Sequence, residues 1–221
     1  MTYYHDRKES IIVPQLTMDG KVVIPEFSLS KDIEKMRNRY EYIFSALECL
    51  QFNPPTLTEL RHAFFDMENG DFICPDFREN VFSLMDRGTS EWTSTFIQQS
   101  EEGCSHIILI NRPYRIYINE CNLLAAEYDG YNSFHVSIPP NGWVTKYDIE
   151  TGWPLKTSEI REDAEKIFGN DSSYFHLTTP VNGIGSVCCA HSKHGNGPFY
   201  IHAGIGPCRY DGNVGMRSCS K

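Results

Sequence analysis

The sequence predicts an α+β fold, with N-terminal helices followed by a mainly antiparallel β-sheet that carries one inserted helix. Two observations favour this class. Apolar residues recur at helical spacing between residues 30 and 66, whereas residues 92–149 are rich in β-branched and aromatic residues separated by turn signals. We divide the 221 residues into an N-terminal arm (1–29), an α+β core (30–182) and a Gly/Cys/His-rich C-terminal tail (183–221) that packs on the core or on a partner.

The arm is predicted to be extended or to form an edge hairpin. Two short apolar runs flank the turn sequence "MDGK" at residues 18–21. Pro14 and Pro25 interrupt these runs. Because proline cannot donate to a strand ladder, neither run is expected in the centre of a sheet.

The first helix is predicted to begin at Ser30, a residue suited to the N-cap. Asp32 and Glu34 fall in its first turn, where the helix dipole favours carboxylates. An apolar stripe follows at helical spacing and indicates core packing or a surface for a partner helix. Its members are Ile33, Met36, Tyr40, Ile43, Phe44, Leu47 and Leu50.

A second, shorter helix is predicted over residues 57–66. Thr56 and Glu59 have the spacing of a capping box, in which each side chain bonds the backbone N–H of the other. The sequence "ENGDFICP" that follows (68–75) is interpreted as a turn and a short strand.

Strands are predicted for most of the second half of the chain. They are "WTSTFIQQ" (92–99), "SHIILINR" (105–112), "YRIYINECN" (114–122), "FHVSI" (134–138) and "SYFHLTTP" (173–180), with a hairpin or turn-containing connection at 145–157. A third helix is predicted at 157–170, stopped by Gly169 or Asn170.

The tail differs in composition from the rest of the chain. Residues 183–221 hold eight of the 16 glycines, four of the eight cysteines and three of the eight histidines. "FYIHAGI" (199–205) is predicted to be a strand, and the remainder is predicted to be loop.

Charge and hydropathy exclude two classes of partner. The net charge of −9 argues against general nucleic-acid binding, which needs a basic face. The longest apolar runs, such as "IILI" (107–110), are too short to span a bilayer. The N-terminal "MTYYHDRKES" lacks the apolar region of a secretory signal, so we expect a cytoplasmic location or one within a particle, with free thiols.

Two similar ten-residue segments are the most specific motif in the sequence. "FHVSIPPNGW" (134–143) and "FHLTTPVNGI" (175–184) each place a histidine two residues before a hydroxyl. In a strand these two residues share a face, so His135, Ser137, His176 and Thr178 would line one cleft if the strands were neighbours. One imidazole would then act as base and the other as acid across a phosphodiester, while the hydroxyls bind its oxygens.

This arrangement resembles the two-histidine phosphoesterases, whose signature is a pair of His-x-Thr/Ser strands. The resemblance implies that His135 and His176 are the catalytic pair and that Ser137 and Thr178 hold phosphate. The alternative is structural. A strand that ends in proline and Asn-Gly is a strand that runs into a turn, and two strands with the same ending look alike.

Thiols and imidazoles in the tail are ligands that suit zinc or copper. Cys188, His191, His194 and Cys208 are the candidate ligands, although no Cys-x-x-Cys pair is present. A nucleophilic interpretation instead pairs Cys208 or Cys219 with His202 or His194.

No GxGxxG, phosphate-binding loop, GxSxG or HExxH motif occurs in the sequence. Our leading hypothesis is therefore a non-catalytic structural or accessory subunit of a larger assembly, such as a virus particle or a multi-subunit complex. Its partners would be protein subunits, in a homo- or hetero-oligomer. The alternatives are a small metal-independent phosphoesterase or ribonuclease-type enzyme and a metal-stabilised binding domain. No cofactor is expected apart from zinc in the last case.

Overall fold

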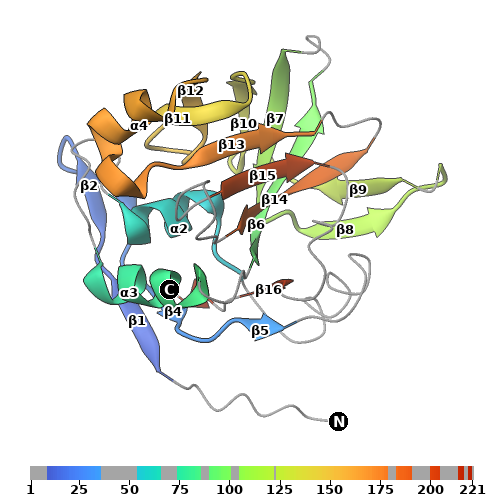
Figure 1. Cartoon of the computed structure of the whole chain (residues 1–221). Coiled ribbons are helices and arrows are strands. Elements are labelled where there is room, and N and C mark those ends of the chain that lie inside the picture. Colours follow the sequence, from blue (N-terminus) through green and yellow to red (C-terminus); the bar gives the residue numbers. More distant parts are fainter. Residues whose placement is uncertain are drawn as a thin grey trace.

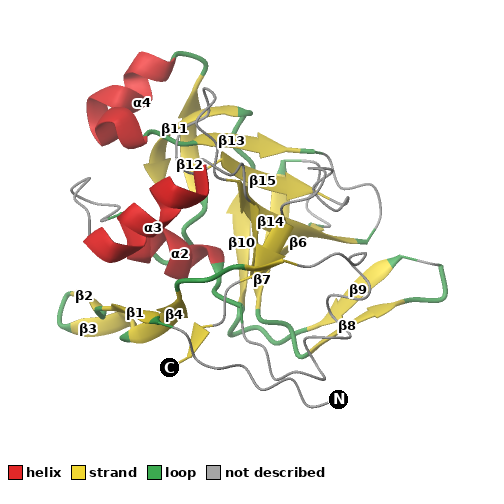
Figure 2. Cartoon of the chain, turned by 60° about the horizontal axis from the view of Figure 1, so that its bottom comes forward, coloured by secondary structure: helices red, strands yellow, loops and turns green. Residues whose placement is uncertain are grey.

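A computed structural model describes residues 9–35, 54–65, 74–85, 90–100, 105–121, 123–178, 183–190, 200–204, 214–216 and 219–220. Within these ranges the chain forms one large mixed sheet, three small sheets and three α-helices (Figure 1). The helices lie on one side of the large sheet, and a separate hairpin projects from the opposite side (Figure 2).

The described chain begins with strands, so the prediction of N-terminal helices followed by a sheet is wrong. Strands β1 (Ser10–Val13), β2 (Leu16–Met18), β3 (Lys21–Ile24), β4 (Phe27–Ser30) and β5 (Glu34–Lys35) come first. Ser30 ends a strand and does not cap a helix, because the alternation of buried Phe27 and Leu29 continues up to it. Most of the predicted apolar stripe (36–50) lies outside the described residues.

The N-terminal arm contains the predicted hairpin. β2 pairs with β3 around Asp19 and Gly20, whose φ angles of 49° and 75° suit a tight primed turn. β1 pairs with β4, and β4 also pairs with β17 (Cys219–Ser220). This three-stranded sheet therefore joins segments from the two halves of the sequence.

The second predicted helix is confirmed as α2 (Leu57–Phe64), and so is its capping box. The Glu59 N–H donates to Thr56 Oγ1 over 3.2 Å, and the Thr56 N–H donates to Glu59 Oε2 over 2.8 Å. Every residue of α2 is buried. Helix α3 (Pro75–Met85) was not predicted, because "FICP" resembles a strand end. Pro75 nevertheless suits the first position of a helix, where its missing N–H costs nothing.

The large sheet runs in the order β10-β7-β6-β14-β15-β13-β11-β12, with β16 and β5 attached beside β6. Its strands are antiparallel except for the pairs β13–β15 and β16–β6. The bounds are β6 Ser90–Gln99, β7 His106–Asn111, β10 Ser133–Ser137, β11 Gly142–Tyr147, β12 Pro154–Ser158, β13 Tyr174–Leu177, β14 Ile184–Ala190, β15 Tyr200–Gly204 and β16 Val214–Met216. Strands β8 (Arg115–Ile118) and β9 (Leu124–Glu127) form the separate hairpin.

Strand β14 occupies the middle of the large sheet, where the sequence predicted a loop. It pairs with β6 on one side and β15 on the other. Gly185 and Ala190 are residue types that are depleted in strands, so local propensity gave only a weak signal. Burial of Val187 and Cys189 in the core explains the strand. The predicted strand at "FYIHAGI" is confirmed as β15, and the third helix is confirmed as α4 (Arg161–Phe168), capped by Gly169.

The large sheet curls around its core. β10 and β11 stand first and seventh in the sheet order, yet residues 138–141 connect them directly. Trp153 Nε1 donates to the Ser137 carbonyl over 3.1 Å, and the Leu177 N–H donates to Asn141 Oδ1 over 2.8 Å. Trp153 is fully buried and packs edge-on against Phe175, with ring centres 5.1 Å apart. These contacts hold the two ends of the curled sheet near each other.

A glycine at the end of the β11–β12 turn tests this packing against α2. Gly152 has a φ of +68°, and a Cβ added there would lie 2.9 Å from Thr58 Cα in the backbone of α2. We expect Gly152→Ala to lower the free energy of unfolding by roughly 2 kcal/mol or more, since strain and a backbone clash add. Gly20→Ala is the control, because φ is +75° there but no atom lies within 4 Å. Urea unfolding measures both, and equal losses would contradict the clash.

Candidate functional site

His135 and Ser137 lie on β10, next to β7. Their neighbours Phe134 and Val136 pack against the core, so His135 and Ser137 face outward, where both are exposed. Ser137 is the register partner of His106, and His135 is the partner of Ile108.

His176 lies on β13 and also faces outward. Phe175 is fully buried, and Leu177 packs against the same core, so alternation directs His176 to the other face of the strand. Thr178 follows the end of β13, and its hydroxyl donates to the Ala203 carbonyl over 3.3 Å.

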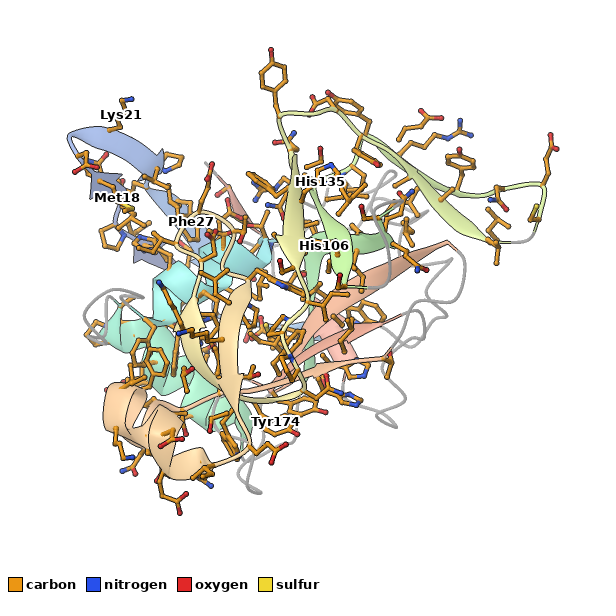
Figure 3. The ribbon with its side chains drawn as sticks, turned by 90° about the horizontal axis from the view of Figure 1, so that it is seen from above. Met18, Lys21, Phe27, His106, His135 and Tyr174 are labelled. Atoms are coloured by element: carbon orange, nitrogen blue, oxygen red, sulfur yellow. The ribbon has the colours of Figure 1, made fainter. Side chains whose placement is uncertain are left out.

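The structure does not bring His135 and His176 together on neighbouring strands. β7, β6, β14 and β15 separate β10 from β13 in the sheet order. Both histidines point away from the core. Because the sheet is curled, they lie on different parts of its outer face. Figure 3 shows His135 beside His106 and on the opposite side of the ribbon from Tyr174, which precedes His176 by two residues. The two motifs are in contact, but not through their histidines. Gly142 of the first motif pairs with Phe175 of the second.

The neighbour of His176 is His202 on β15. β13 and β15 run parallel, with Tyr174 opposite Tyr200 and His176 opposite His202. The two imidazole rings have centres 5.3 Å apart and are tilted by 32°, while the two phenol rings are stacked at 5.8 Å with an angle of 7°. We call these four side chains the Tyr-His ladder.

An aromatic row continues the ladder across the outer face of the sheet. Trp143 on β11 meets Tyr174 edge-on, with ring centres 5.4 Å apart. The guanidinium of Arg161, at the start of α4, lies over the Trp143 ring at 4.9 Å, which is cation–π distance. The sheet thus presents half-buried rings flanked by a guanidinium, which is itself paired with Glu165 at 2.6 Å.

The ladder disfavours the charged form of one imidazole. Burial lowers the pKa of His202 below its ordinary value, and the neighbouring His176 lowers it further by charge repulsion. Nδ1 of His176 is buried and makes no hydrogen bond. A repeated Tyr-x-His-x pattern, "YFHL" (174–177) and "YIHA" (200–203), was the signal for this pair in the sequence.

Of the four metal ligands predicted in the tail, only the backbone of Cys188 can be placed. Cys188 lies on β14, opposite Trp92 and His202 in register. His191, His194 and Cys208 lie outside the described residues. Among the residues that the structure describes, no group of three histidine, cysteine or acidic side chains is arranged to hold a metal ion.

Cys219 lies in a buried polar cluster, and its partners there are distant from it in the sequence. Its Sγ is 3.7 Å from a guanidinium nitrogen of Arg112 and 3.9 Å from Glu59 Oε2. Arg112 and Glu59 form an ion pair at 2.5 Å, with the Glu59 side chain only 5% exposed. This cluster connects α2, the end of β7 and β17.

The β8–β9 hairpin projects from the body of the molecule (Figure 1). Arg115 and Glu127 pair across it at 3.7 Å, and Tyr114 donates a hydrogen bond to Asp129 at its base. Large apolar side chains are nevertheless exposed there. Tyr114 is 66% exposed and Ile118 48% exposed.

Comparison of the sequence with protein-family models and with curated proteins finds no match, and comparison of the fold with solved structures finds none either. No described helix combines the length and the apolar character needed to cross a bilayer.

Proposed function

We propose that the protein is a non-catalytic accessory subunit of a larger assembly, inside the cell or within a particle, and that it joins a second copy of itself through β8. The observation that carries this proposal is the projecting hairpin. Within the described residues β8 pairs with β9 alone, so its other edge has no strand beside it. Exposed edge strands are templates for pairing with another chain.

The composition of β8 supports an interface at this edge. Monomeric proteins usually protect an edge strand with charged side chains, proline or a bulge. In "RIYI" Arg115 is the one charged residue, at the first position, and Ile118 is exposed at the other end, immediately after the half-buried Tyr117. A two-stranded hairpin is marginally stable by itself, so pairing with further strands stabilises it. A two-fold symmetric dimer formed along β8 needs only one kind of surface, because each copy presents the same strand to the other.

The phosphoester hypothesis has less support. It requires His135 and His176 on neighbouring strands, and four strands separate theirs.

Ile118→Lys tests the interface. We expect the unmodified chain to be dimeric or larger at micromolar concentration, and the variant to be monomeric, because a lysine on an exposed edge strand disfavours pairing with another chain. Light scattering coupled to size-exclusion chromatography measures the mass. Ile167→Lys on α4 is the matched control, since Ile167 is 50% exposed, and it should leave the mass unchanged. A monomeric unmodified chain, or equal effects of the two variants, would contradict the proposal.

A further inference from the structure

We propose that His176 and His202 together bind one divalent transition-metal ion of the zinc type, on the outer face of the large sheet. This site is separate from the assembly surface on β8. It also differs from the ligand set that the sequence suggested in the tail.

The strand register places the two donors at a suitable separation. A zinc–nitrogen bond is about 2.0–2.1 Å long and a ring centre lies roughly 1 Å behind its nitrogen, so two imidazoles on one tetrahedral ion have centres about 5 Å apart. The rings of His176 and His202 are 5.3 Å apart. The second side-chain torsion of histidine is broad. We therefore expect rotation about this torsion to bring one nitrogen of each ring toward a common point while the backbone stays in place.

The environment of His176 also favours a ligand at this position. The buried Nδ1 of His176 has no hydrogen-bond partner, which costs free energy that ligation or donation would recover. Tyr200 lies beside both imidazoles, with its ring centre 6.3 Å from each of theirs.

Imidazole donors suit zinc, copper and nickel. No third histidine, cysteine or acidic side chain completes the set within the described residues, so water would fill the remaining positions there. We therefore expect weaker binding than at a four-ligand structural zinc site, and an ion that the fold does not need.

Calorimetric titration of the full chain with zinc chloride at pH 7.5 tests the site, with His176→Asn and His202→Asn as variants. Each variant should weaken binding at least about ten-fold, since even the loss of a residue that only supports a ligand costs 10–100-fold. His135→Asn is the matched control, because His135 is exposed on β10 and should not affect binding. Circular dichroism checks that each variant is folded. If His176→Asn does not fold, His176→Thr replaces it, because threonine favours strands.

A cobalt titration distinguishes the possible ligands. Imidazole ligation gives only weak visible absorption, whereas thiolate ligation adds strong near-ultraviolet charge-transfer bands. Absorption without those bands, lost in both histidine variants, supports the site. Unchanged affinity in the variants, thiolate bands that persist in them, or no binding by the unmodified chain would overturn it.

Discussion

Glu59→Ala is expected to lower the free energy of unfolding by about 3–5 kcal/mol, because it leaves a guanidinium without its buried partner. Glu59 pairs with Arg112 at 2.5 Å and also bonds the Thr56 N–H at the start of α2. The substitution therefore removes an ion pair and half of a capping box together. Denaturant unfolding followed by circular dichroism measures the loss.

Glu59→Gln separates these two contributions. The amide oxygen still accepts from the Thr56 N–H, so the cap is kept while the charge is removed. We expect a loss between that of the alanine variant and zero. Glu79→Ala, at an exposed position on α3, should change stability by less than about 0.5 kcal/mol. A Glu59→Ala loss as small as that of Glu79→Ala would show that the cluster adds nothing to stability.

Trp153→Ala is expected to cost about 3–5 kcal/mol, as large aromatic side chains do when removed from a packed core. Trp153 is fully buried, contacts Phe175, and bonds the Ser137 carbonyl at the end of β10. It therefore connects the first strand of the curled sheet with strands at its other end. Thermal and urea unfolding measure the effect.

Two controls divide this loss between packing and hydrogen bonding. Trp153→Phe keeps an aromatic ring against Phe175 but loses the indole N–H, so we expect a loss of about 1–3 kcal/mol from the unsatisfied Ser137 carbonyl. Trp143→Ala removes a half-buried indole from the outer face and should cost less than Trp153→Ala. Equal losses for the two alanine variants would contradict the role assigned to Trp153.

Sequence patterns predicted the elements whose local residue preferences favour the same conformation that the tertiary structure requires. The capping box of α2 formed because Thr56 and Glu59 satisfy each other's backbone within one turn. The β2–β3 turn formed because Asp19 and Gly20 accept positive φ. These features depend on a few adjacent residues, so a single sequence is enough to find them.

Elements that depend on distant contacts were missed. β14 contains Gly185 and Ala190, residue types that strands disfavour, and it is a strand because β6 and β15 bond both of its edges. Helix α2 carries Glu59, Arg61 and His62, residues typical of an exposed face, yet it is buried. Partners distant in sequence, such as Arg112 for Glu59 and the Pro14 carbonyl for His62, make that burial possible.

The candidate site was partly predictable. His176 was identified, but it was matched with His135 through the similarity of "FHVS" and "FHLT". The segments in register are instead "YFHL" and "YIHA". Their similarity is shorter and lies within the strands, before the residues that end them. Strand endings resemble each other because turns require the same few residues, whereas residues that face each other within a sheet report which strands are neighbours.

The pairing of β17 with β4 also constrains the order of events during synthesis. Cys219 pairs with Leu29, a separation of 219 − 29 = 190 residues. A ribosome adds roughly 5–20 residues per second, so β4 waits on the order of ten seconds or more for this partner. During that interval one edge of β4 is open, and chaperones have their best opportunity to bind it. An open strand edge is a template for pairing with another chain, so β17 protects β4 from such pairing once it is in place.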